Sequence, residues 1–139
     1  MLIDRLAPTN NWNPNNDEDS PWGIKSEKVN GQTVHRRSKF AIRLQWIRNN
    51  YTSLGCNADA PTVMRYTRAY IMDLLGSVLF PDKSDDQVPV MYLQFLGDLN
   101  TRYNWGQAVL AFLYRQLSMA YSAKTKSMAG PLMLLQQWA

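Results

Sequence analysis

The stretch YTRAYIMDLLGSVLFPDKSDD, residues 66–86, changes from an apolar run to a short acidic one at Pro81. The apolar part of this stretch belongs to a helical pattern over residues 60–79. In that pattern, apolar side chains form two adjoining stripes beside a narrow seam of polar or small residues. A helix that is apolar on so many sides is usually surrounded by other helices. Gly76 costs such a helix about 1 kcal/mol relative to alanine, which predicts that another backbone approaches closely there. Because Phe80 precedes a proline, the helix is expected to end at that residue.

The residues upstream of this helix also show helical spacing. Asp59 stands where it can cap the start of the central helix. Before it, Ser38 can cap an earlier helix, and apolar residues then recur at spacings of four, three and four. These apolar residues are Phe40, Leu44, Ile47 and Tyr51.

Downstream of residue 86 the helical pattern returns three times. Asp85 or Asp86 can cap a helix over residues 86–99, residues 106–122 form a second strongly apolar helix, and residues 131–139 begin a last one. The sequence therefore predicts an all-α fold, with about five helices packed round two apolar central helices, residues 60–79 and 106–122.

The N-terminal quarter of the chain has a different composition. Residues 1–37 are rich in Asn, Asp and Pro, which favour turns, and they carry almost no apolar periodicity. They are predicted to form a polar, irregular loop or a partly disordered segment, and residues 38–139 the helical domain. Within the first segment, Asn30-Gly31 suits the tight turn of a small β-hairpin, because both positions accept positive φ.

The acidic stretch FPDKSDD, residues 80–86, could be a catalytic loop or a turn between helices. A magnesium site usually takes carboxylates from more than one element, whereas these acids lie in one short segment and include two capping positions. We therefore expect a turn and no metal. His35 and Cys56 are the single histidine and the single cysteine of the chain, and neither lies in a catalytic or zinc-binding motif. The sequence predicts no catalytic residue, no cofactor and no metal site.

Positive charge is concentrated in one part of the sequence. Seven basic residues lie between Lys25 and Arg48, against the single acid Glu27. Such a cluster can contact phosphate or an acidic partner, or it can be the solvated start of a helix. The candidate contacts are Arg36, Arg37, Lys39 and Arg43, with Lys39 and Arg43 one helical turn apart. Weak, non-specific nucleic-acid binding at low salt is expected from them.

The sequence shows no secretory signal and no membrane-spanning segment. The longest strictly apolar run, Ala108 to Tyr114, is far too short to cross a bilayer. A single cysteine is compatible with a reducing compartment.

Four phrases in order resemble the plant mobile domain, a family also labelled the aminotransferase-like plant mobile domain. They are RLQWIRNNY (43–51), RYTRAYIMDLLGSVLFPDKSDDQVPVMYLQFLGDL (65–99), YNWGQAVLAFLYRQLSMA (103–120) and GPLMLLQQWA (130–139). The resemblance covers residues 38–139. The family pattern continues past residue 139, so the chain is expected to be a central fragment.

The resemblance implies a nuclear, non-enzymatic protein-interaction module, transposon-derived and linked to meristem maintenance and to silencing of genes and transposons. Other proteins are the implied partners, a phosphatase-like nuclear protein among them. The alternative is a nucleic-acid-binding module that acts through residues 25–48. A pyridoxal-phosphate enzyme is not expected, because Lys83 is the nearest candidate for a Schiff base and has no phosphate-binding loop beside it.

Overall fold

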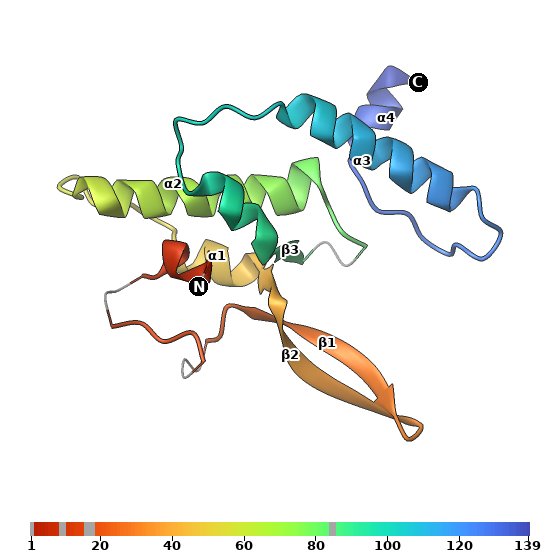
Figure 1. Ribbon diagram of the computed structural model, residues 1–139, viewed down its shortest axis with the longest axis horizontal. Coiled ribbons are helices and arrows are strands. Elements are labelled where there is room, and N and C mark those ends of the chain that lie inside the picture. The colour runs from red at the N-terminus through yellow and green to blue at the C-terminus, as the bar shows by residue number, and fades with distance from the viewer. Residues whose placement is uncertain (1, 9–10, 16–18, 84–85) are drawn as a thin grey trace.

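The computed structural model describes residues 2–8, 11–15, 19–83 and 86–139, and it has a mixed α+β fold (Figure 1). Three antiparallel strands form one sheet in the order β1-β2-β3, so the prediction of an all-α fold is wrong. In chain order the elements are the 3₁₀ helix η1 (Leu2–Leu6), β1 (Trp22–Val29), β2 (Gln32–Arg43), α1 (Leu44–Asn50), α2 (Ala60–Leu74), the π-helical turn η2 (Leu75–Leu79), β3 (Gln87–Pro89), the 3₁₀ helix η3 (Val90–Leu96), α3 (Trp105–Ala120) and α4 (Leu132–Trp138).

The tight turn expected at Asn30-Gly31 is confirmed. Asn30 has φ of 51° and Gly31 has φ of 80°, and the strands close around them at the pair Val29 and Gln32. Two positive-φ residues give the type I′ turn, whose twist matches that of the flanking strands. The hairpin is long, because β1 pairs with β2 from Gly23 and Ser38 outward to this turn.

The helix predicted from Ser38 is replaced by the second half of β2. The register between β1 and β2 shifts between Trp22 and Gly23, so that residues 39–41 bulge out of the ladder. Phe40 lies in this bulge and is 82% exposed, and it does not share a helical face with Leu44. Residues 41–43 then pair with β3. These ladder hydrogen bonds to two distant strands outweigh the local helical spacing, and a helix starts only at Leu44.

The helix predicted over residues 86–99 is also wrong in its first part. Val88 pairs with Ile42 in the sheet, and both side chains are fully buried. Pro89 has ψ of 130°, which is extended rather than helical. Residues 90–96 form η3, a short 3₁₀ helix, and residues 97–99 are not helical.

The helix predicted over residues 60–79 is confirmed as α2 followed by η2. Asp59 caps it, since its side chain accepts a hydrogen bond of 3.2 Å from the amide of Thr62. The last turn widens to a π-helical one, in which the amide of Phe80 donates to Leu75. Something does approach Gly76 closely, but it is the side chains of Val88 and Leu44 rather than a backbone: a Cβ at Gly76 would lie 2.7 Å and 2.9 Å from their nearest atoms.

The hydrophobic core lies where α1, α2, η1, η3 and the base of the sheet meet. The N-terminal η1 contributes to it, and the phenol of Tyr51 donates a hydrogen bond to the carbonyl of Leu6. Burial raises the pKa of the Tyr51 phenol above its ordinary range. The largest fully buried side chains include Ile3, Leu6, Ile42, Leu44, Trp46, Met72, Leu75, Val88 and Leu93.

Two parts of the molecule extend from this core. Figure 1 shows the β1–β2 hairpin leaving at the lower edge of the view, and α3 with α4 lying at the upper edge. The prediction of a helix over residues 106–122 is confirmed by α3, but its central position is not. Only Val109 and Leu113 of α3 are buried, because this helix lies at the edge of the molecule and not at its centre (Figure 1).

Candidate functional site

An apolar surface covers α3 and α4. We call it the α3–α4 apolar surface and define it by Leu110, Tyr114, Leu134 and Trp138. Leu134 is 49% exposed, Tyr114 62% and Trp138 86%, although all are large apolar or aromatic side chains. Side chains of this size are normally buried, so a cluster of them on one surface is a feature that requires an explanation.

A cavity of about 310 Å³ lies within this surface between the two helices. None of the described residues that line it is charged, so a group that fills it would be apolar. Its lining consists of Leu110, Leu113, Tyr114, Leu117, Leu134, Leu135 and Trp138.

Local sequence signals place the two helices that form this cavity. Asn104 caps α3 by accepting a hydrogen bond of 3.0 Å from the amide of Gln107. Gly130, with φ of 119°, makes the turn before α4. The amide of Gly130 also donates to the carbonyl of Pro81 at 3.1 Å, which ties the start of α4 to the end of the α2–η2 helix.

A second row of exposed apolar side chains runs along α2 and η2. Tyr70 is 65% exposed and Val78 54%, with Val63 and Leu74 between 37% and 40%. This row is one of the two apolar stripes that were expected to be covered by other helices, so α2 is open on one side.

The narrow seam of polar and small residues faces the body instead. Ala69 and Gly76 are buried, and the Arg68 guanidinium donates to the carbonyls of Leu96 and Gly97 at 2.9 Å and 3.1 Å. Burial lowers the pKa of Arg68. The small residues of the seam let η3 and β3 approach α2 closely. Arg68 supplies hydrogen-bond donors to the carbonyls at the end of η3. For both reasons this side of α2 faces the core.

The four predicted basic contacts do not form one patch. Arg36, Arg37 and Lys39 are exposed on β2. Arg43 instead anchors the base of the hairpin: it pairs with Asp19 at 2.8 Å and donates to the carbonyl of Ser20. Its predicted place one helical turn from Lys39 is wrong, because both residues belong to a strand.

Arg48 and His35 are also engaged. Arg48 pairs with Asp73 of α2 at 2.9 Å. His35 shares a hydrogen bond of 2.7 Å with Ser26 across the hairpin. Cys56 is a free, exposed thiol in the loop between α1 and α2, so the structure places it on a different element from His35.

The acidic stretch connects η2 to β3. Pro81 is buried, and Asp82 and Lys83 are exposed. Ser84 and Asp85 lie outside the described residues, so the capping role expected of Asp85 is not tested. Asp86 precedes a strand rather than a helix, and its carbonyl accepts from the amide of Leu44 at 2.8 Å.

Within the described ranges, no group of three or more His, Cys, Asp or Glu side chains is arranged to hold a metal ion. In the same part of the chain, no helix is long and apolar enough to cross a membrane.

The fold and its exposed surfaces define a small α+β domain that has a helical apolar surface and a projecting basic hairpin. The chain belongs to the plant mobile domain family, whose sequence model matches residues 15–139. This match includes the hairpin, which the resemblance over residues 38–139 left out.

Three Arabidopsis thaliana proteins illustrate the relationship, each over 100 residues and 70% of this chain. The chain is 37% identical to the Serine/threonine-protein phosphatase 7 long form homolog, 38% to Protein MAIN-LIKE 2 and 31% to Protein MAINTENANCE OF MERISTEMS. It spans 8%, 15% and 21% of their respective lengths. No solved structure matches the chain.

Proposed function

We propose that this plant mobile domain is a non-enzymatic protein-interaction module of the nucleus, which serves meristem maintenance and the silencing of genes and transposons. Relatives named MAINTENANCE OF MERISTEMS and MAIN-LIKE support the link to meristems. The nuclear location and the silencing role rest on the resemblance to the family.

The observation that carries the interaction function is the α3–α4 apolar surface. Contiguous apolar surface rimmed by polar residues is characteristic of protein–protein interfaces, and aromatic side chains are enriched at their centres. Tyr114 and Trp138 flank an apolar cavity of about 310 Å³, so a partner would insert apolar side chains between them.

A phosphatase-like protein is the partner that we propose. The support is the name of one relative, a long form homologue of a serine/threonine-protein phosphatase. That relative shares the domain with this chain, and it supplies a defined probe for the surface.

The test is a calorimetric titration of the chain with the purified Serine/threonine-protein phosphatase 7 long form homolog. Truncating a central interface aromatic typically costs about 2 kcal/mol or more, roughly a 30-fold loss of affinity. We therefore expect the double variant Tyr114→Ser, Trp138→Ser to bind at least 30-fold more weakly than the unmodified chain.

Phe40→Ser supplies a matched control. Phe40 is 82% exposed but lies on the hairpin rather than on α3 or α4, so its truncation should leave the affinity unchanged. Equal binding by the double variant and the unmodified chain would show that the surface is not the interface. An unmodified chain that does not bind the probe would show that the proposed partner is wrong.

A further inference from the structure

The net charge of this chain resides in the hairpin. Residues 22–40 are the hairpin without its base residues 41–43, where Arg43 is paired with Asp19. They contain five basic residues and one acidic residue, a net charge of +4. The other residues contain ten basic and ten acidic side chains, which balance, and the whole chain carries +4. Charge that is concentrated on one element creates a positive electrostatic potential around it, which attracts negatively charged ligands.

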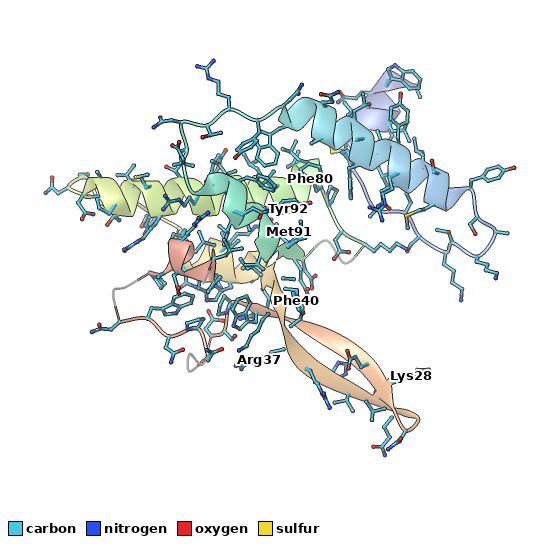
Figure 2. The ribbon with its side chains drawn as sticks, viewed as in Figure 1. Lys28, Arg37, Phe40, Phe80, Met91 and Tyr92 are labelled. Atoms are coloured by element: carbon cyan, nitrogen blue, oxygen red, sulfur yellow. The ribbon has the colours of Figure 1, made fainter. Side chains whose placement is uncertain are left out.

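Four cations of the hairpin are exposed at different points along its length. Lys28, Arg36, Arg37 and Lys39 are all exposed, and none of them forms an ion pair with a carboxylate of the described residues. Figure 2 shows Lys28 toward the tip of the hairpin and Arg37 nearer its base. Arg48 is the other exposed arginine between residues 25 and 48, and it lies on α1 rather than on the hairpin. It is paired with Asp73, so it is not free to contact a phosphate.

The strand register distributes these cations over both faces of the ribbon. Lys28 lies opposite Thr33 and Arg37 opposite Ile24, so these two cations share one face. Arg36 is the neighbour of Arg37 on the same strand and therefore points to the other face. A ribbon with cations on both faces can contact phosphates that lie on both sides of it.

Duplex DNA is the nucleic acid that fits this arrangement. The major groove of B-DNA admits a two-stranded β-ribbon between two phosphate rows, whereas the major groove of an RNA helix is too deep and narrow for side chains. Single strands are bound by rows of stacking aromatic side chains. Of the hairpin's two aromatic residues, Trp22 is 5% exposed, which leaves Phe40 alone on the surface.

We propose that the β1–β2 hairpin is an arm that binds duplex DNA in the major groove, through contacts from Lys28, Arg36, Arg37 and Lys39 to phosphates. Phosphate contacts carry no sequence information, so binding is independent of sequence. This activity uses a different surface from the protein-binding one on α3 and α4, and either can fail without the other.

The test is fluorescence anisotropy with a labelled duplex of mixed sequence at 50 mM and 200 mM salt. Four phosphate contacts give a slope of about −3.6 in log affinity against log salt, or a roughly 150-fold loss over this range. The triple variant Arg36→Gln, Arg37→Gln, Lys39→Gln should reduce the slope to about −0.9 and weaken binding at the lower salt concentration.

The control variant removes the same charge elsewhere. Arg115→Gln, Lys124→Gln, Lys126→Gln also lowers the net charge by three, but these residues lie on α3 and in the segment after it. It should retain the slope and nearly all of the affinity. Thermal unfolding of both variants checks that the fold is intact.

Three outcomes would overturn the proposal. The first is equal loss of affinity in the two triple variants, which would indicate a general effect of net charge. The second is tighter binding to a single-stranded RNA or to polyglutamate than to the duplex. The third is displacement by netropsin, which occupies the minor groove, and not by methyl green, which occupies the major groove.

Discussion

At the scale of single residues, Asp59 shows how one side chain fixes the start of α2. Its carboxylate accepts a hydrogen bond from the amide of Thr62, one of the four amides that a helix start leaves without a partner. Hydrogen bonding to Thr62 lowers the pKa of Asp59 from its ordinary value of 3.8. The folded state therefore holds the proton of this group less tightly than the unfolded state.

The consequence is a pH dependence with a definite sign. A group whose pKa is lowered by folding contributes stability above its unfolded pKa, and this stability is lost as the pH falls through the folded pKa. We expect Asp59→Ala to lower the unfolding temperature at pH 7, and the difference from the unmodified chain to narrow below about pH 4.

Asp59→Asn separates capping from charge, because Asn also caps helices well but does not ionise. At pH 7 it should be more stable than Asp59→Ala. Circular dichroism melts of the three proteins between pH 3 and pH 7 measure both effects. A difference between the unmodified chain and Asp59→Ala that stays constant over this range would refute the assigned role of the carboxylate.

At the scale of elements, the contact between α2–η2 and β3 depends on a glycine. Alanine at position 76 would favour the helix by about 1 kcal/mol, but its Cβ would lie 2.7 Å from Val88 and 2.9 Å from Leu44. Both neighbours are buried and cannot move freely. Overpacking of this kind costs about 1–3 kcal/mol. An approach of 2.7 Å requires a buried neighbour to shift, so we take the upper part of this range, about 2–3 kcal/mol, which exceeds the gain.

We predict that Gly76→Ala lowers the free energy of unfolding by about 1–2 kcal/mol, as the net of these two effects. Gly106→Ala in α3 is the matched control, because a Cβ there would have its nearest neighbour at 3.8 Å. It should be neutral or stabilise the chain by up to about 1 kcal/mol. Urea denaturation of both variants measures the difference, and a Gly76→Ala protein as stable as the control would contradict the packing described for β3.

The elements also show what the sequence could and could not predict. The helices at 60–79 and 106–122, the last helix and the turn at Asn30-Gly31 were predictable, because their signals are local. The second half of β2 and strand β3 were not, since residues 38–43 and 87–89 carry helical or capping signals. Their state is decided by pairing between segments about 45 residues apart. Because residues 38–43 form a strand and not the predicted helix, Arg43 lies at the base of the hairpin and pairs with Asp19. Of the four predicted basic contacts, Arg36, Arg37 and Lys39 remain exposed on the hairpin.

At the scale of the whole molecule, two surfaces lie on different parts of the fold. The charged one is the hairpin, and the apolar one is formed by α3 and α4 (Figure 1). The sequence indicated apolar helices but could not show which of their sides would be exposed. The sequence pattern shows how many sides of a helix are apolar, but the burial of each side depends on which elements pack against it. In α2 the seam of polar and small residues faces the rest of the fold, and one of the apolar stripes is exposed.

The central claim is that the α3–α4 apolar surface binds a protein partner. Hydrogen–deuterium exchange of the chain, alone and with the Serine/threonine-protein phosphatase 7 long form homolog, tests it most directly, because it locates the protected amides in the unmodified chain. We predict slower exchange on binding in residues 105–120 and 132–138 and no change in the hairpin, residues 22–43. Protection confined to the hairpin or to α2, with unchanged exchange in α3 and α4, would contradict the claim.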